Sequence, residues 1–237
     1  MFPINDDITS HKRPIVTQII MAVNILIFAC QLFMGPLQAS LMHRNFGFVP
    51  SAFFSSLFSS RIVFEACTLI SSQFLHGGWS HIISNMLYLW VFGDNVEDEM
   101  GHLPFLLFYL GSGAVGALCH GLLEMRSYVP LIGASGAIAG LMGAYFVLFP
   151  GARIRSFIPL FFVFFTTINI PAIFYLGAWF LLQILNNSFA AGADTVAYAA
   201  HIGGFMVGVL VGLWWRRRRR DRWEIEEPEY NTYYPQQ

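Results

Sequence analysis

Residues 196–215 read VAYAAHIGGFMVGVLVGLWW, and five arginines follow at positions 216–220. These twenty residues contain no Asp, Glu, Lys or Arg. A helix of about that length crosses the hydrocarbon core of a bilayer, which is about 30 Å thick. Because Lys and Arg concentrate in cytoplasmic loops, the basic block orients the segment. The stretch therefore predicts a membrane-spanning helix whose C-terminal end faces the cytoplasm.

The composition of the rest of the chain agrees with a membrane setting. The 237 residues are 56% hydrophobic and 11% charged, and they include 24 Phe. An average soluble domain carries about 25% charged residues, so these values favour a chain that lies largely in lipid. The three cysteines, at positions 30, 67 and 119, have no paired spacing, and we expect neither a disulfide framework nor a metal site. No nucleic-acid motif accompanies the basic block, so no such partner is expected.

Six apolar segments are long enough, with their flanks, to cross a bilayer. They are Ile15 to Met34, Ser80 to Phe92, Leu103 to Leu123, Leu131 to Phe149, Ala172 to Leu185, and Val196 to Trp215. The second and fifth are short, and we expect both to extend. A further apolar stretch, residues 157–166, contains Pro159 and is followed by Pro171, and we interpret it as interfacial or re-entrant. The predicted fold is an all-α membrane protein with six transmembrane helices over residues 15–215.

The distribution of basic residues predicts that both chain termini are cytoplasmic. Residues 1–14 form the cytoplasmic N-terminal segment, and the first apolar run is expected to be a retained signal anchor rather than a cleaved signal. Residues 216–237, basic and then acidic, form a cytoplasmic tail that is expected to be disordered. The basic block is interpreted as an orientation signal, and binding of anionic lipid is the alternative.

Three polar strings interrupt the apolar sequence: His81-Ile-Ile-Ser-Asn85, Gly133-Ala-Ser135-Gly136 and Ala200-His201-Ile-Gly. Polar side chains are costly in hydrocarbon, so they usually have a partner or a function there. The predicted topology places Ser135 and His201 at the outer ends of the fourth and sixth helices. Ser135 then has a base within reach if these helices touch, as their small-xxx-small glycines favour. The alternative is that the glycines only pack helices and that Ser135 bonds a carbonyl of its own helix.

His81 and Asn85 are four residues apart, which places them on one face of the second helix. An imidazole and an amide directed at one point suit an oxyanion, because developing negative charge is stabilised by preorganised donors. The main-chain N–H of Ser135, at a helix start, is a further donor. These two side chains could instead, or also, bridge helices by hydrogen bonds. Asp194 is about 10 Å of helical rise from His201, so a Ser-His dyad is predicted and Asp194 is assigned to a loop or cap.

Taken together, the motifs resemble those of the rhomboid intramembrane serine proteases, bacterial type. The resemblance covers Phe74-Leu-His76-Gly-Gly-Trp-Ser-His81, Asn85, Gly93 to Gly101, Gly133-Ala-Ser135-Gly136 and Ala200-His201-Ile-Gly-Gly204. It implies a six-helix bundle with a long, partly embedded first outer loop, Gly35 to Gly78. It also implies that Ser135 is the nucleophile and His201 the base, with His81 and Asn85 at the oxyanion and with His76, Gly133 and Gly136 in support.

The resemblance further implies cleavage of single-pass or multi-pass transmembrane substrates near the outer face of a bacterial inner membrane, without metal or cofactor. Some members carry Tyr four residues after the serine, packed on the histidine, where this chain has Ala139; Tyr198 is a candidate replacement. In the family the fifth helix is implicated in substrate entry, so Trp179 and Phe180 are expected either to line that gate or to face lipid. The functional alternative is an inactive rhomboid-like protein that binds membrane clients, against which the joint presence of Ser135 and His201 argues.

Overall fold

The computed structural model describes residues 2–161, 164–189 and 197–226. Within them the chain is mostly helical, with a small three-stranded sheet. The elements are β1 (Phe2–Asp6), α1 (Ile15–Leu32), α2 (Pro36–Phe46), α3 (Pro50–Ser56), α4 (Ile62–Ser71), a 3-10 turn (Ser72–Phe74), α5 (Trp79–Met100), α6 (His102–Leu123), α7 (Ser135–Leu148), β2 (Arg153–Phe161), β3 (Phe164–Pro171), α8 (Ala172–Phe189) and α9 (Tyr198–Glu226).

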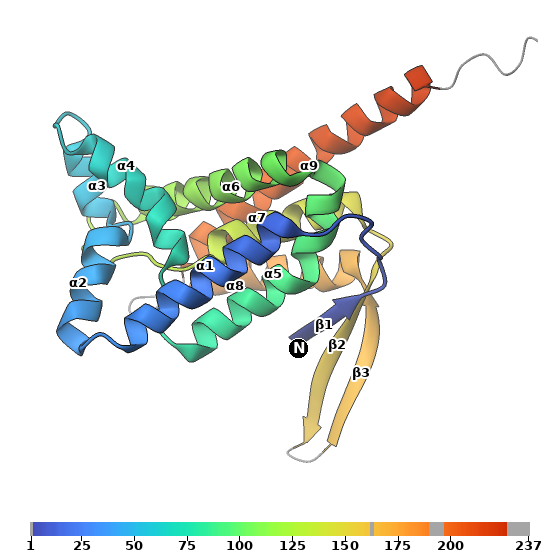
Figure 1. The fold of residues 1–237 in the computed structure, drawn as a ribbon, viewed down its shortest axis with the longest axis horizontal. Helices are drawn as coiled ribbons and strands as arrows, with labels where there is room; N and C mark the ends of the chain where they lie inside the picture. The colour runs from blue at the N-terminus through green and yellow to red at the C-terminus, as the bar shows by residue number, and fades with distance from the viewer. Residues whose placement is uncertain (1, 162–163, 190–196, 227–237) are drawn as a thin grey trace, which may run out of the picture.

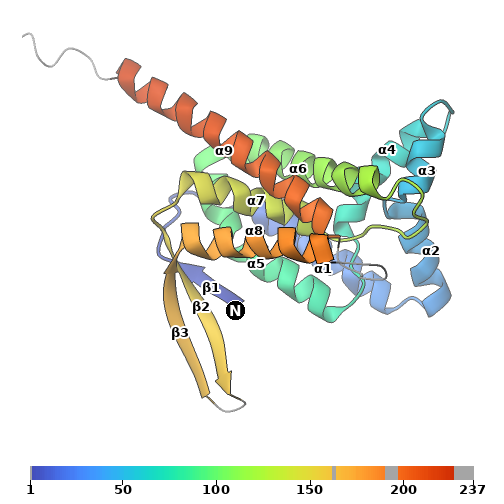
Figure 2. The ribbon, with the colours of Figure 1, turned by 180° about the vertical axis from the view of Figure 1, so that it is seen from behind.

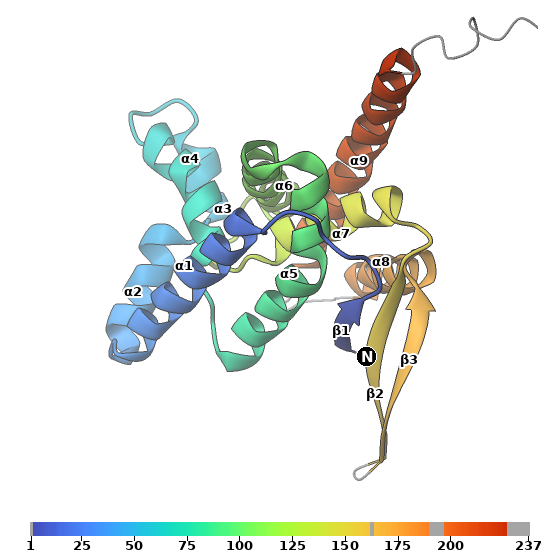
Figure 3. The ribbon, with the colours of Figure 1, turned by 45° about the vertical axis from the view of Figure 1, so that its right-hand side comes forward.

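Helix α7 is the centre of the bundle. It contacts α5, α6, α8 and α9, and nearly every residue from Gly136 to Val147 is buried. Helices α2, α3 and α4 gather at one end of the bundle, whereas the sheet and the end of α9 lie at the other (Figures 1 and 3). The long loop expected between the first two membrane segments thus contains three short helices and a 3-10 turn.

Three helices in the described part of the chain are long and apolar enough to cross a membrane: α1, α6 and the Tyr198–Arg219 portion of α9. Leucines on each of them remain open to the surroundings, with exposed fractions of 65% for Leu26, 64% for Leu107 and 62% for Leu210. Such side chains are favourable in lipid and unfavourable in water.

The observed helix bounds agree with the prediction for α5 and α8 and differ from it for α7. Helices α5 and α8 extend beyond the predicted segments, to Met100 and Phe189, as anticipated. Helix α7 begins at Ser135 rather than residue 131, because residues 131–134 run through a bridge to Phe48 and a turn at Gly133. Asp194, predicted in a loop or cap, lies outside the described residues.

Residues 216–226, part of the tail that the sequence predicts to be disordered, continue α9. Arginine is a good helix former, so the basic block extends the helix instead of ending it. Arg219 also pairs with Glu99 of α5 at 2.8 Å, and the guanidinium of Arg218 lies over the ring of Trp214. The basic block is therefore partly held against the bundle.

The sheet corrects the all-α prediction, and the described residues within 157–166 form strands rather than a re-entrant segment. Strands β2 and β3 form an antiparallel hairpin, and β1 pairs antiparallel with β2 (Figure 2). Along β2, exposed Arg153 and Arg155 alternate with buried Ile154 and Ser156, which is the period of a strand. Cross-strand pairing joins the backbone of β2 to β1 on one side and to β3 on the other, and Pro159 lies beside a register shift.

Helix α1 begins after Pro14 without a side-chain cap of its own. The carboxylate of Glu97, on α5 and 1% exposed, supplies the cap from outside. It accepts hydrogen bonds of 2.8 Å from the backbone N–H groups of Val16 and Thr17, 2.7 Å from the Thr17 hydroxyl, and 2.6 Å from His102. A carboxylate at a helix N-terminus is stabilised by free N–H groups, so Glu97 joins α1, α5 and α6.

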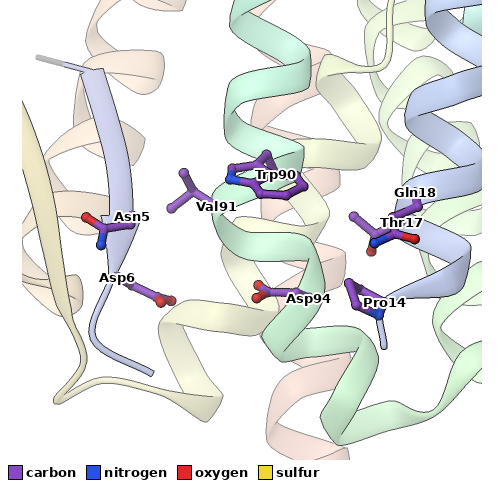
Figure 4. A pocket seen from close by; sticks show the side chains of 8 residues that line it. All are labelled: Asn5, Asp6, Pro14, Thr17, Gln18, Trp90, Val91 and Asp94. Atoms are coloured by element: carbon purple, nitrogen blue, oxygen red, sulfur yellow. The ribbon is translucent and has the colours of Figure 1, made fainter. Parts of the chain in front are cut away.

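Asp6 fastens the N-terminal strand to the bundle beside a small cavity of about 110 Å³ (Figure 4). Its carboxylate accepts hydrogen bonds from the Asn95 amide at 2.7 Å and from the Tyr145 hydroxyl. Burial raises the pKa of Asp6 from 3.8 to about 6; the Tyr145 hydrogen bond opposes this rise and the charge of Asp94 adds to it. The folded state therefore holds the Asp6 proton more tightly than the unfolded chain.

The sign of this shift predicts how docking of β1 depends on pH. Because the folded pKa is raised, the stabilisation from Asp6 is fully present below about pH 4 and is lost as pH rises through about 6. Protection of β1 amides from hydrogen exchange, corrected for intrinsic rates, is expected to fall between pH 4.5 and 7 in the wild type. Asp6→Asn should flatten that change, whereas an equal fall in the variant would contradict the assignment.

Helices α7 and α9 approach each other through glycines, as expected for the fourth and sixth membrane segments. A β-carbon placed on Gly204 would overlap the carbonyl oxygen of Gly136, and one on Gly208 would overlap that of Gly140. Backbone, rather than a flexible side chain, occupies this space. The small-xxx-small pattern therefore brings the helices bearing Ser135 and His201 into direct backbone contact.

We expect Gly208→Ala to destabilise the protein by about 1–3 kcal/mol or more, because the methyl group forces α7 and α9 apart. Gly111→Ala is the matched control, since a β-carbon at this position on α6 meets nothing within 4 Å. Thermal unfolding in a single detergent should show a lowered midpoint for Gly208→Ala and a midpoint near that of the wild type for Gly111→Ala. Equal midpoints for the two variants would rule out the close contact.

Candidate active site

The hydroxyl of Ser135 lies 2.8 Å from Nε2 of His201, which is a hydrogen bond. Ser135 is the first residue of α7, and His201 is the fourth residue of α9. The start of α9 is fixed by close packing: a β-carbon on Gly116 of α6 would contact the carbonyl oxygen of Ala200 at 2.6 Å. The packing of α7, α6 and α9 thus brings together the predicted pair, whose two residues are 66 positions apart in the chain.

The other imidazole nitrogen of His201, Nδ1, lies 2.8 Å from Oε1 of Gln183 on α8. Gln183 is 8% exposed, and its Nε2 is 3.4 Å from the carbonyl oxygen of Trp179. Gln183 is not among the site residues predicted from the sequence. The signal available was an amide with apolar residues on both sides of it in the sequence, where an unpartnered polar group is costly.

Two aromatic rings flank His201. The ring centroids of Trp179 and His201 are 5.9 Å apart, and the two rings are tilted by 37°. The ring of Tyr198 lies edge-on to the imidazole, with 6.5 Å between the centroids. Ala139, where some family members have Tyr, is fully buried. Tyr198 thus does contact the histidine as expected, and Trp179 provides a second, closer ring from α8.

Trp179 and Phe180 both contact α9. The Phe180 ring stacks on Phe205 at 4.3 Å with an interplanar angle of 16°, and Trp179 lies 6.2 Å from Phe205. The next two residues, Leu181 and Leu182, are 55% and 54% exposed. This face of α8 therefore packs on the helix that carries His201, while the leucines point outward.

His81 and Asn85 of α5 both face Gly133, two residues before Ser135. A β-carbon on Gly133 would be 2.5 Å from Nε2 of His81 and 3.7 Å from Nδ2 of Asn85. Gly133 has φ +117, a conformation that side-chain-bearing residues rarely adopt. Its N–H also donates to the carbonyl oxygen of Ser72 at 2.9 Å. Glycine is required here both for the backbone turn and for the approach of His81.

His76 lies behind this group and is 1% exposed. Its Nε2 is 2.9 Å from Nδ2 of Asn85, and its ring is 5.0 Å from that of His81. Gln31 of α1 holds the backbone of His76 at two points: it accepts from the His76 N–H at 3.2 Å and donates to the carbonyl at 3.0 Å. Gln31 was not predicted, and it links α1 to the site.

Gly136 differs from Gly133. A β-carbon at Gly136 would meet its nearest neighbours, among them the Ala200 carbonyl oxygen, at 3.7 Å, which is ordinary contact. Its conformation also carries no positive φ. The structure therefore leaves room for a methyl group at Gly136, while the carbonyl of that residue forms part of the contact with Gly204.

These groups together can carry out acyl transfer. A hydroxyl is hydrogen-bonded to a base, and the base is bonded on its far side to an acceptor. The amide of Asn85 has two N–H groups, of which one is directed to His76, so the second remains for a ligand. The main-chain N–H of Ser135, at the first position of α7, lacks an acceptor within its own helix.

The chain is similar in sequence to known proteins that carry the rhomboid name. The family model of the Rhomboid domain matches residues 63–218. Rhomboid protein 1, mitochondrial, of Saccharomyces cerevisiae is 36% identical over 155 residues, which cover 61% of this chain and 40% of that protein. Rhomboid protease GluP of Bacillus subtilis is 32% identical over 140 residues, 59% of this chain and 24% of the relative.

Presenilin-associated rhomboid-like protein, mitochondrial, of Pongo abelii is 27% identical over 213 residues, which cover 88% of this chain and 50% of that protein. The chain thus spans half or less of the length of these three relatives. Ser135, His201, His81, Asn85 and His76 all lie within the matched residues 63–218.

Proposed function

The chain belongs to the rhomboid family, and on this premise we propose that it is an intramembrane serine endopeptidase. The hydrogen bond of 2.8 Å between Ser135 and His201 carries the proposal. A serine hydroxyl is a weak nucleophile until a neighbouring base accepts its proton, and this chain has such a base in place. An inactive relative that only binds clients would have no need of both groups.

The proposed reaction begins when Ser135 Oγ attacks the carbonyl carbon of a substrate peptide bond and its proton passes to Nε2 of His201. The negative charge that develops on the carbonyl oxygen is stabilised by His81, by the second N–H of Asn85 and by the main-chain N–H of Ser135, which are placed to donate hydrogen bonds to it. Collapse of the intermediate returns the proton from His201 to the leaving amine. Water, deprotonated by the same imidazole, then hydrolyses the acyl-enzyme.

We propose that the substrates are single-pass or multi-pass membrane proteins cut near the outer surface. The 14 residues of α7 span about 21 Å, less than the roughly 30 Å of a bilayer core, so Ser135 at its start can lie below one surface. The sheet, with Arg153 and Arg155, and the Arg216–Arg219 part of α9 lie at the opposite end of the bundle (Figure 1). Basic residues favour the cytoplasmic side, so the site faces outward.

In this arrangement the chain crosses the membrane six times, through α1, α5, α6, α7, α8 and α9, and both termini are cytoplasmic. Helices α2 to α4 then lie at the outer surface, as the partly embedded first loop. The proposed location is a bacterial inner (plasma) membrane; GluP, one of the relatives, comes from a bacterium.

A cleavage assay with reconstituted protein tests the proposal. The full chain and a single-pass membrane protein are incorporated together in liposomes, in buffer with EDTA and without ATP, and products are mapped by mass spectrometry. We expect one cut in the outer third of the transmembrane segment. A cut confined to a soluble portion of the substrate, or binding of the substrate without any cut, would overturn the proposal and favour the client-binding alternative.

A further inference from the structure

We propose that Gln183 is a positioning residue for His201, so that the reacting groups form a Ser135–His201–Gln183 relay. The inference rests on the proposed protease function. It starts from two distances of 2.8 Å, which join the two nitrogens of one imidazole to a hydroxyl on α7 and to an amide oxygen on α8. Three different helices therefore meet at a single ring.

Gln183 selects the tautomer of His201 that a base requires. The amide Nε2 of Gln183 is directed at the Trp179 carbonyl, four residues earlier on the same helix, and this leaves Oε1 toward the imidazole. An amide oxygen only accepts hydrogen bonds, so Nδ1 of His201 must carry the proton. The lone pair of Nε2 is then available to the hydroxyl of Ser135.

Gln183 also assists the charged state of the base. When His201 receives the Ser135 proton, the imidazolium keeps its Nδ1–H donated to the amide oxygen of Gln183. The amide group is held in place by the hydrogen bond that its Nε2 donates to the Trp179 carbonyl oxygen. A neutral amide suits this setting, because an ionised carboxylate would be costly in an apolar helix. The residue thus performs, without charge, the orienting role of the third member of a hydrolase triad.

Because the acceptor comes from α8, the position of α8 controls the orientation of the base. Helix α8 meets α9 through the Phe180–Phe205 stack and through Trp179, which contacts both His201 and Phe205. Movement of α8 away from α9 separates Gln183 from Nδ1 and frees the imidazole to rotate. Docking of α8 on α9 is therefore expected to speed proton transfer.

Two substitutions separate positioning from simple packing. Gln183→Met keeps the length of the side chain and removes the acceptor, whereas Gln183→Glu keeps an acceptor at the same place. Leu182→Met, one residue away and 54% exposed, is the matched control. The readout is the reaction of purified full-length protein with a fluorophosphonate probe, in which Ser135 Oγ bonds to phosphorus, its proton goes to His201 and fluoride leaves.

We expect Gln183→Met to lower the maximal rate of inactivation by about 10- to 100-fold with the apparent affinity for the probe unchanged. Gln183→Glu, which keeps an oxygen acceptor at the same place even when the carboxyl group is neutral, should retain most of the wild-type rate. Leu182→Met should react like the wild type.

The inference is overturned if Gln183→Met reacts within twofold of the wild type. It is also overturned if Gln183→Met and Gln183→Glu lose reactivity equally and share a lowered thermal midpoint, because the role is then structural. Either result leaves the proposed function standing when the wild type reacts at Ser135. A wild type that does not react would instead remove the proposed function, and with it this inference.

Discussion

Replacing Ser135 or His201 by alanine is expected to lower kcat for cleavage of a transmembrane substrate by about 10⁴-fold. Each change removes one partner of the 2.8 Å hydrogen bond that activates the serine in the proposed mechanism. Because the two groups act as one unit, the double variant should lose no more activity than either single variant. Initial rates in liposomes at saturating substrate measure the effect.

The serine on an exposed face of α3, Ser55, provides the control for this series, because its hydroxyl only bonds a carbonyl of its own helix. Ser55→Ala should retain the wild-type rate. If Ser135→Ala keeps more than about 1% of the activity, or if the losses of the single variants multiply in the double variant, the serine and the histidine do not work as a pair.

Asn85→Ala is expected to lower kcat by about 10²- to 10³-fold, the usual effect of removing one oxyanion donor, while KM changes little. Asn85 is 5% exposed and directs one N–H to His76, so the second N–H is preorganised beside Gly133. The donor matters only once charge develops, which is why kcat rather than KM should respond. Steady-state rates over a range of substrate densities in liposomes separate the two constants.

The neighbouring Ser84→Ala tests whether any change in this turn of α5 has the same effect. The Ser84 hydroxyl donates to the His81 carbonyl within the helix, and its loss should leave the rate near that of the wild type. A larger loss for Ser84→Ala than for Asn85→Ala, or an effect of Asn85→Ala on KM alone, would contradict the oxyanion role.

Some residues of the candidate site can be predicted from one helix alone, because they are polar groups in an apolar run or because their spacing places them on one helix face. Ser135 and His201 stand out as polar groups in apolar runs, and the separation of four residues places His81 and Asn85 on one face. Gln183 and Gln31 are equally costly in such a setting, but their importance comes from partners 18 and 45 residues away. A periodicity within one segment carries no information on such partners.

The sheet illustrates a different limit. The alternation of Arg153, Ile154, Arg155 and Ser156 is a strand signal, but the apolar residues that follow and the flanking prolines favoured a membrane interpretation. Strand β1 could not have been found in the same way, because its five residues are stabilised by pairing with residues about 150 positions later and by the contact of Asp6 with Tyr145. Long-range pairing of short segments leaves almost no local pattern.

The bounds of the helices were predictable where hydrophobicity ends at a turn and not where a charged segment continues the helix. Hydropathy placed the end of the last span at Trp215, yet α9 continues to Glu226, because arginine disfavours lipid but favours helix. A membrane boundary and a helix boundary are separate features, and only the first is read from hydropathy.

The most direct test of the proposed protease is to label the purified full-length protein with a fluorophosphonate probe and to map the adduct by mass spectrometry. The wild type should carry a single adduct on Ser135, and both Ser135→Ala and His201→Ala should carry none. The proposal would be contradicted by an adduct on another residue, or by the absence of any adduct on folded wild type under conditions that label an active rhomboid protease.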